Sequence, residues 1–136
     1  HVPKASHICC LYPCTPLLKP QYLTDSFERW QSSNSLYCFP VLEFESNVLR
    51  SLKLSDTGEV SSMFSQHELT RTQDLPQAYF DAGQFYWGGR EAWLGEDKIH
   101  NHALGYVLPK YSVVDIDDDN DWRFAERLYQ AQLALA

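Results

Sequence analysis

The chain has 136 residues, of which 44% are hydrophobic, 21% charged and 14% aromatic, and its formal net charge is −7. This composition excludes a disordered chain, a collagen-like repeat and a coiled coil, and the length predicts one domain with a usable core. The acidic balance argues against nucleic acid as a partner, and no apolar run approaches the roughly 20 residues that cross a membrane. The sequence begins without an initiator Met or a signal-peptide pattern, so we expect an excerpt from a longer chain.

The four cysteines, at positions 9, 10, 14 and 38, do not predict a disulfide framework. Cys9 and Cys10 are adjacent in an apolar run, and neighbouring strand residues point to opposite faces. We expect all four thiols to be reduced and mostly buried in a cytoplasmic protein. A zinc site built on Cys10 and Cys14 lacks a second pair of ligands at a usual spacing.

The first third of the chain predicts a strand, a helix and a second strand. Residues 7–12 form a nearly all-apolar run, which is typical of a central strand of a parallel sheet, buried on both faces. A helix is predicted over 20–33, with Pro20 at its first position. Its apolar stripe consists of Leu23, Phe27 and Trp30. Residues 36–44 are predicted as a strand in which Pro40 marks an edge or a bulge.

The middle of the chain predicts a hairpin, an irregular loop and an aromatic strand. Residues 48–64 contain two apolar stretches around a polar loop, in which Gly58 can take the left-handed conformation. Residues 65–78 are polar and irregular. A strand with an aromatic face is expected at 83–88, and a short helix at 89–95.

The last third predicts two strands and a helix. We expect strands at 103–108 and 113–116, and a helix that begins near Asp119 or Asn120. The apolar stripe of this helix consists of Trp122, Ala125, Leu128, Tyr129 and Leu133. Strands that alternate with helices predict an α/β fold, and no internal repeat or domain boundary is evident.

Five aspartates between positions 115 and 121 are the densest chemical signal. Asp115 and Asp117 are two residues apart at a predicted strand end, which places both carboxylates on one face. Such a pair suits Mg²⁺, which completes its coordination with water and substrate phosphate. The alternative is a solvated turn and helix start, because the helix dipole favours acidic residues there. That alternative explains Asp118, Asp119 and Asp121 better than it explains the first pair.

Three further groups of residues are weaker candidates. Arg71 and Gln73 lie in a polar loop, where an Arg can bind a carboxylate or phosphate through two bonds but is also commonly solvated. Tyr86 lies on the predicted aromatic strand, where core packing is the alternative. His100 and His102 have the spacing of one strand face, but no third metal ligand lies nearby. The six glycines form none of the usual phosphate-binding or nucleophile motifs.

Four stretches carry a resemblance in combination: 70–76 (TRTQDLP), 81–87 (DAGQFYW), 114–117 (VDID) and 121–126 (DWRFAE). Together they resemble the C-terminal half of the CMP-sialic acid synthetase family, and the likeness covers nearly the whole chain. Residues 11–17 (LYPCTPL) stand where the sialic acid branch has Gln-Pro-Thr-Ser-Pro-Leu, with Tyr12 in place of the Gln. Tyr12 and the DAGQFYW stretch favour the branch that acts on pseudaminic acid.

This resemblance implies a Mg²⁺-dependent transfer of CMP from CTP to the anomeric hydroxyl of a nine-carbon acidic sugar. Pyrophosphate would leave, and the product would serve cell-surface glycans or flagellin glycosylation. The resemblance assigns the metal to Asp115 and Asp117, and substrate contacts to Tyr12, Arg71, Gln73 and Tyr86. The sialic acid branch has a basic residue directly before the Gln of the loop, where this chain has Thr72; Arg71 lies one position earlier. No catalytic residue is assigned.

The resemblance also implies a fold and an assembly. We expect a three-layer α/β/α architecture of the nucleotide-diphospho-sugar transferase type, with a mostly parallel sheet. A protruding hairpin at 42–70 would pair two copies through its apolar residues, which are Val48, Leu52, Leu54, Val60 and Met63. The family's basic, Gly-containing loop for the CTP phosphates is not in this sequence, so these 136 residues alone are expected to be nearly inactive. The alternatives are a CMP-N-acetylneuraminate synthase and a non-catalytic binding or dimerisation module.

Overall fold

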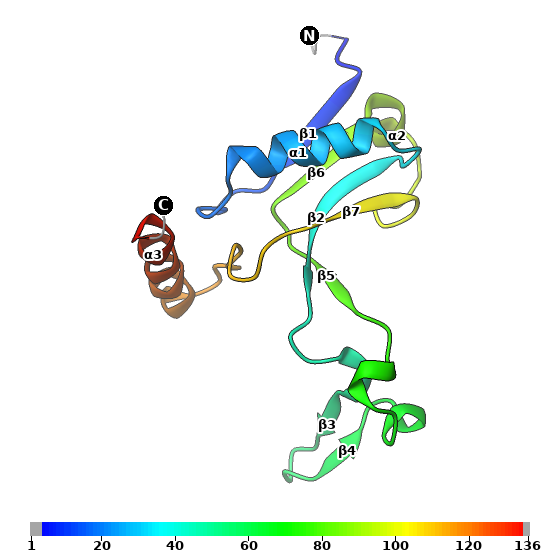
Figure 1. The fold of residues 1–136 in the computed structure, drawn as a ribbon, viewed down its shortest axis with the longest axis vertical. Coiled ribbons are helices and arrows are strands. Elements are labelled where there is room, and N and C mark those ends of the chain that lie inside the picture. The colour runs from blue at the N-terminus through cyan, green and yellow to red at the C-terminus, as the bar shows by residue number, and fades with distance from the viewer. Residues whose placement is uncertain (1–3, 135–136) are drawn as a thin grey trace. The chain divides into compact units, whose positions relative to one another are not determined.

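The computed structural model describes residues 4–134, which form two compact units (Figure 1). The first unit comprises residues 4–42 and 81–134, and the second comprises residues 43–80. The chain is α/β, as predicted. No helix within 4–134 combines the length and the apolar character needed to span a membrane.

A mixed sheet is the centre of the first unit. Its strands are β1 (His7–Leu11), β2 (Tyr37–Glu43), β5 (Tyr79–Asp81), β6 (Phe85–Gly89) and β7 (Ala103–Val107), in the order β1-β6-β2-β5 with β7 paired to β2. β6 is antiparallel to both β1 and β2, whereas β7 is parallel to β2. The prediction of a mostly parallel sheet is therefore wrong, because β6 enters between β1 and β2 in the opposite direction.

β1 is an edge strand of the described sheet and not a central one. Its only neighbour in the strand order is β6, and Cys10 and Leu11 are exposed. The apolar run predicted burial on both faces, but one side of this strand has no partner within residues 4–134. The register pairs Cys9 with Trp87 and Cys10 with Tyr86, so the adjacent thiols point to opposite faces as predicted.

All four cysteines are free thiols, which agrees with the prediction of reduced cysteines. The prediction that most of them are buried is wrong: Cys38 is buried and Cys9 half-buried, whereas Cys10 and Cys14 are exposed. Within the described residues no group of three or more His, Cys, Asp and Glu has the arrangement of a metal site, so the zinc alternative gains no support.

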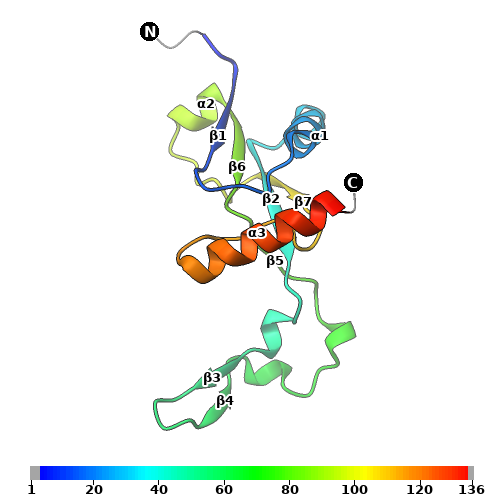
Figure 2. The same cartoon turned by 90° about the vertical axis from the view of Figure 1, so that its left-hand side faces the viewer.

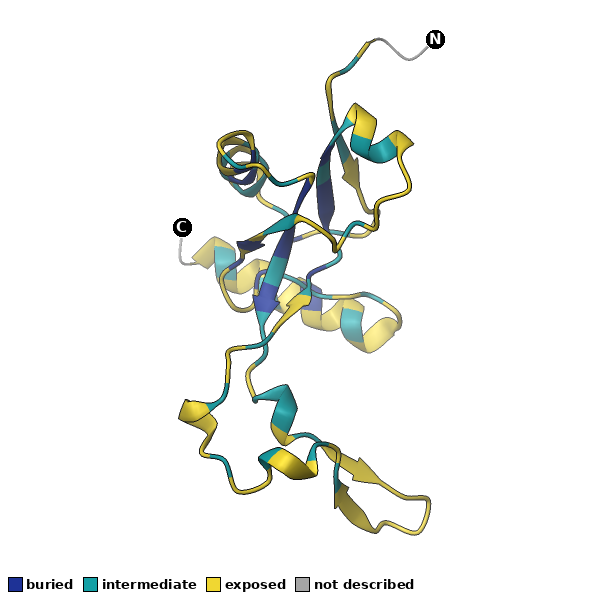
Figure 3. Cartoon of the chain, turned by 90° about the vertical axis from the view of Figure 1, so that its right-hand side faces the viewer, coloured by how far each residue is buried: buried dark blue, intermediate teal, exposed yellow. Residues whose placement is uncertain are grey.

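Helix α1 (Pro20–Gln31) covers one face of the sheet and builds the main core. Pro20 occupies the start of the helix, as predicted. Trp30 is buried and stacks on Trp87 of β6 with ring centroids 6.5 Å apart, and the Trp87 Nε1–H donates to Ser26 Oγ over 3.2 Å. The buried core cluster consists of Trp30, Cys38, Leu42, Ala82, Tyr106 and Leu108, and Figure 3 shows such buried positions gathered on the central strands.

Pro40 lies in a central strand, so of the two predicted alternatives, an edge or a bulge, the edge position is wrong. It is fully buried, and β2 has neighbours on both sides. A residue without a backbone N–H is tolerated here because the hydrogen-bond ladder between β2 and β6 is interrupted before Pro40. β2 pairs with β6 only through Tyr37 and Cys38, and Pro40 itself contributes its carbonyl oxygen, which accepts from the Ala82 N–H at 3.0 Å.

The other face of the sheet carries helix α2 (Arg90–Leu94), within the segment predicted to be helical. The Tyr37 hydroxyl donates to the Ala92 carbonyl over 2.7 Å, and the Tyr37 ring packs edge-on against Trp93. His100 and His102 follow in a turn before β7, and not on a strand. His102 has a φ of +52°, so the spacing that suggested two imidazoles on one strand face does not apply.

The C-terminal segment forms helix α3 (Asp119–Ala134), which begins where predicted (Figure 2). Residues 113–116 form no strand, so that prediction is wrong. Of the predicted apolar stripe only Ala125 is buried, and Leu128 is half-buried. The stripe residues Trp122, Tyr129 and Leu133 are exposed.

The second unit contains a two-stranded hairpin and three short 3₁₀ turns. β3 (Leu52–Leu54) pairs antiparallel with β4 (Val60–Ser62), and Gly58 in the connecting loop has a φ of +84°, as predicted. The strands are shorter than expected, because Val48–Arg50 is a 3₁₀ turn; the other two turns are Ser65–His67 and Thr72–Asp74. Of the apolar hairpin residues, Leu52, Leu54, Val60 and Met63 are exposed and Val48 is half-buried.

Candidate functional site

A cluster of aromatic side chains lies on the sheet face opposite α1. Because Trp87 faces α1, its neighbour Tyr86 points to the other side of the sheet. The Tyr86 ring lies 5.2 Å from the Tyr12 ring and 5.6 Å from the Phe39 ring, between centroids. Phe39 in turn packs edge-on against the His100 imidazole at 5.2 Å. Four segments that are distant in sequence therefore contribute to one surface.

Asp81 links this cluster through its carboxylate. The Tyr86 hydroxyl donates to it, with the phenol oxygen 2.9 Å from Oδ2 and 3.0 Å from Oδ1. The Gly83 backbone N–H also donates to Oδ1, over 2.9 Å. The His100 Nε2 atom lies 3.1 Å from Oδ2. One carboxylate thus connects a buried phenol, a backbone turn and an imidazole.

The protonation of Tyr86 follows from its surroundings. Burial raises the pKa of the Tyr86 phenol well above its ordinary range, and the hydrogen bond and negative charge of Asp81 raise it further. The phenol therefore remains neutral and acts as a donor to Asp81.

The structure brings two of the predicted substrate residues together, but they differ in access. Tyr12 is 48% exposed, whereas Tyr86 is only 6% exposed and its hydroxyl is bonded to Asp81. Arg71 and Gln73 belong to the second unit, where both are exposed at the Thr72–Asp74 turn. In that turn the Arg71 carbonyl accepts from the Asp74 N–H at 3.0 Å.

The acidic run divides into capping residues and free carboxylates. Asp118 Oδ1 accepts from the Asn120 N–H at 2.7 Å and from the Asp121 N–H at 3.1 Å. Asp121 Oδ2 accepts in return from the backbone N–H groups of Asp117 and Asp118, each at 3.1 Å. This reciprocal arrangement is a capping box. The helix-start interpretation is therefore confirmed for Asp118 and Asp121.

The carboxylates of Asp115 and Asp117 take no part in this cap. Both side chains are exposed, and neither forms a hydrogen bond or an ion pair with another residue of the described range 4–134. Two free carboxylates with one residue between them have the donor chemistry of a Mg²⁺ site, which needs only one or two protein ligands. Residues 113–116 form no strand, so the expected common strand face does not hold the two carboxylates together; any ion bound by this pair would depend on water and substrate phosphate for its other ligands.

A buried contact fixes the loop that leads to these carboxylates. Gln84 and Ser112 are each 2% exposed. The Gln84 Nε2–H donates to the Ser112 carbonyl over 3.3 Å, and the Ser112 hydroxyl donates to the Pro109 carbonyl over 2.6 Å. The sheet that carries Tyr86 is thus connected directly to the segment that precedes Asp115.

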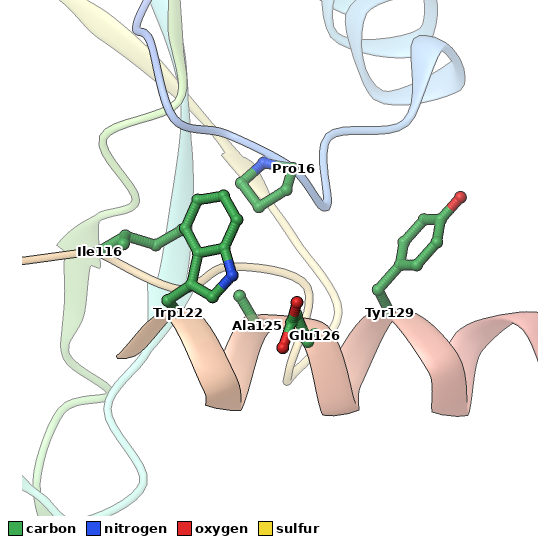
Figure 4. A pocket seen from close by; sticks show the side chains of 6 residues that line it. All are labelled: Pro16, Ile116, Trp122, Ala125, Glu126 and Tyr129. Carbon is green, nitrogen blue, oxygen red and sulfur yellow. The ribbon is translucent and has the colours of Figure 1, made fainter. Parts of the chain in front are cut away.

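A hollow of about 300 Å³ lies between α3 and the loop after β1. Figure 4 shows the Trp122 ring next to Pro16, and Tyr129 rising from the same side of the helix farther along. The other lining residues are Ile116, Ala125 and Glu126. The lining is almost entirely apolar and contains no Lys or Arg, so this hollow is not suited to a triphosphate.

The sequence did not indicate Asp81 and His100 as members of one site. A local signal for Asp81 was present: the Asp-x-Gly pattern of residues 81–83 is typical of a turn in which the Asp side chain accepts from a backbone N–H two residues on. Gly83 has the positive φ, +60°, that such a turn favours. No spacing rule pointed to His100, because its link to Asp81 is a tertiary contact across 19 residues.

Comparison with known proteins shows what the chain is similar to. No protein-family model matches it. It is 40% identical over 125 residues, 91% of its length, to the pseudaminic acid cytidylyltransferase of Campylobacter jejuni subsp. jejuni serotype O:2. It is 37% identical over 124 residues to a Helicobacter pylori protein named pseudaminic acid cytidylyltransferase and UDP-2,4-diacetamido-2,4,6-trideoxy-beta-L-altropyranose hydrolase. A weaker similarity, 25% over 126 residues, relates it to N-acylneuraminate cytidylyltransferase B of Danio rerio.

The matched share differs between this chain and its relatives. The similarity covers 90–92% of this chain but 54% of the Campylobacter protein, 24% of the Helicobacter protein and 30% of the zebrafish protein. The chain thus spans about half the length of the Campylobacter relative. These relatives are named as cytidylyltransferases, which are nucleotidyl-transferring enzymes. The resemblance indicated by the motifs is therefore confirmed, and the chain is a relative of the pseudaminic acid cytidylyltransferases.

Proposed function

We propose that the protein is a cytidylyltransferase that transfers CMP from CTP to the anomeric hydroxyl of pseudaminic acid and releases pyrophosphate. It would act in the cytoplasm and supply an activated sugar for cell-surface glycans or flagellin. The observation that carries the proposal is the 40% identity to the Campylobacter enzyme over nearly the whole chain. The lower identity to the N-acylneuraminate enzyme, 25%, favours pseudaminic acid over N-acetylneuraminic acid as the sugar.

Asp115 and Asp117 are proposed to hold a Mg²⁺ ion. Their support is that both carboxylates are exposed and free of structural hydrogen bonds among the described residues, whereas Asp118 and Asp121 are used in the cap. Bound Mg²⁺ supplies charge neutralisation for the transferring phosphoryl group. The role of the two aspartates is to orient the ion and the phosphate toward the sugar, since phosphoryl transfer depends mainly on positioning and electrostatics.

The sugar is proposed to bind beside Tyr12 and Tyr86 of the first unit. Gln73 and Arg71 remain proposed substrate-binding residues on the strength of the sequence resemblance. Tyr12 presents an exposed aromatic ring against which the apolar face of a sugar can pack. The three-layer transferase architecture and a dimer formed through the hairpin are part of the same proposal. The exposed apolar residues of the hairpin, above all Leu54 and Leu52, support pairing with a second copy, because an isolated hairpin is marginal in water.

The first test measures pyrophosphate release from CTP and Mg²⁺ by the protein expressed from its complete natural reading frame. Pseudaminic acid and N-acetylneuraminic acid are offered side by side. We expect release with pseudaminic acid. Release with N-acetylneuraminic acid alone would retain the enzyme class and overturn the sugar assignment. Absence of release with both sugars would overturn the proposal in favour of the non-catalytic module.

A further inference from the structure

We propose that His100 is a sugar-binding residue that presents its Nδ1 atom as a hydrogen-bond acceptor, and that Asp81 is the positioning residue that orients it. The ligand groups recognised would be hydroxyl or amide N–H donors of an acylated amino sugar. This inference rests on the proposed function, and it gives roles to two residues, Asp81 and His100, to which the sequence resemblance assigned none. It also gives Tyr86 an indirect role, as the residue that holds Asp81 in place.

The first step is that Asp81 is held rigidly. Its carboxylate accepts from the Tyr86 hydroxyl and from the Gly83 N–H, and each of these donors is itself fixed. Tyr86 is buried in the sheet, and Gly83 forms the turn that follows Asp81. The Asp81 side chain is 26% exposed, so it reaches the surface without being free to rotate there.

The second step is the tautomer of His100. An ionised carboxylate can accept hydrogen bonds but cannot donate one, so the Nε2 atom, 3.1 Å from Asp81 Oδ2, must carry the hydrogen. In the neutral imidazole the other nitrogen, Nδ1, then holds a free lone pair. Asp81 therefore determines which ring nitrogen acts as an acceptor, in the same way that a buried carboxylate orients a catalytic imidazole.

The third step is access. The His100 side chain is 68% exposed, whereas Tyr86 is 6% exposed. No hydrogen bond to His100 Nδ1 is formed by the residues within 4–134. The ring rests edge-on against Phe39, which orients it without covering it. Of the groups attached to the Asp81 carboxylate, the imidazole is thus the one that a ligand can reach.

Substitution by Gln separates a ligand role from a structural role. In His100→Gln the side-chain amide can still donate to Asp81 from a position close to that of Nε2, but the acceptor at Nδ1 is lost. We expect the KM for pseudaminic acid to rise roughly three- to tenfold, the loss of one neutral hydrogen bond, with kcat and the KM for CTP within twofold of the wild type. Asp81→Asn should also raise the KM for pseudaminic acid.

The matched control is His102→Asn. This residue lies in the same exposed turn, and Asn tolerates its φ of +52°. Its contact with the rest of the fold is through its backbone carbonyl, which accepts from the Leu36 N–H, so the side chain can be exchanged without losing that bond. We expect its sugar KM to be unchanged. A wild-type KM in His100→Gln, or an equal rise in the control, would overturn the inference while leaving the proposed function intact.

A readout independent of turnover is ¹⁵N NMR of the imidazoles in the same protein. We expect His100 to be protonated at Nε2 and unprotonated at Nδ1, and the Nδ1 resonance to move when pseudaminic acid is added but not with CTP alone. A proton on Nδ1 of the neutral ring, or an Nδ1 resonance unaffected by the sugar, would overturn the inference. If the wild type releases no pyrophosphate with either sugar, the proposed function fails, and this titration still decides whether His100 contacts the sugar.

Discussion

The cap of α3 and the proposed metal pair lie within seven residues of each other, and substitution can separate them. Asp118→Ala removes the two bonds that Asp118 Oδ1 accepts from the Asn120 and Asp121 N–H groups. Loss of an N-cap acceptor costs about 1 kcal/mol, which corresponds to roughly a fivefold change in the opening equilibrium of the helix. Among the described residues of α3 only Ala125 is buried, so little packing offsets this loss, and we expect local opening of the helix.

Native-state hydrogen exchange measures this opening directly. In Asp118→Ala the amides of residues 122–126 should exchange about fivefold faster, whereas the amides of β6 serve as an internal reference and should not change. Asp115→Asn is the matched control, because the Asp115 carboxylate accepts no bond from the helix start. Its exchange should equal that of the wild type.

A Mg²⁺ titration of the same two variants completes the comparison. Asp115→Asn should weaken Mg²⁺ binding clearly, and Asp118→Ala should leave it nearly unchanged. Unaltered exchange in Asp118→Ala would refute the assignment of the cap. Unaltered Mg²⁺ binding in Asp115→Asn would refute the metal assignment. The whole acidic run would then serve only as a solvated turn and the start of α3.

Three further outcomes follow from the backbone and from the thiols. Gly58→Ala should destabilise the β3–β4 hairpin by about 1 kcal/mol, because a Cβ at a φ of +84° is strained although nothing lies within 4 Å of it; NMR of the Leu54–Val60 pairing checks this. Burial raises the pKa of the Cys38 thiol from 9.0 to about 12, because the folded protein disfavours the thiolate. The free energy of unfolding therefore keeps its full value below pH 9.0 and falls as the pH rises toward 12. Urea unfolding between pH 9 and pH 12 measures this loss of stability. In a separate experiment at pH 8, a thiol reagent should modify the exposed Cys10 well before the buried Cys38. A wild-type hairpin, or rapid labelling of Cys38 in the folded chain, would contradict these expectations.

The local elements could be predicted because their signals lie within a few residues of one another. Pro20 marked the start of α1, Gly58 the left-handed position of the hairpin loop, and the acidic run 115–121 the start of α3. Each of these features depends on a backbone conformation or a cap that one side chain decides. Their boundaries could therefore be predicted to within a few residues without knowledge of the tertiary fold.

The arrangement of the strands could not be obtained in this way. An apolar run predicts burial but carries no information on direction, so β1 was expected to be parallel and central, whereas it is antiparallel and at the edge of the described sheet. Residues 113–116 have the alternation of a strand, but a strand also requires a partner ladder. At this point the chain is instead fixed by the buried contact from Gln84 to Ser112, which alternation cannot reveal.

The alternation of side chains between the two faces of a strand explains why only part of the site could be predicted. Asp81 and Tyr86 are five residues apart, and an odd spacing in one continuous strand places two side chains on opposite faces. Gly83, with a φ of +60°, lies between the end of β5 and the start of β6 and turns the chain there, so the alternation is interrupted and the carboxylate reaches the phenol. Tyr86, one of the predicted substrate residues, consequently donates its hydroxyl proton to Asp81 inside the protein. Recognition at this face then depends on the groups that remain exposed, the Tyr12 ring and the imidazole of His100, whose orientation Asp81 sets.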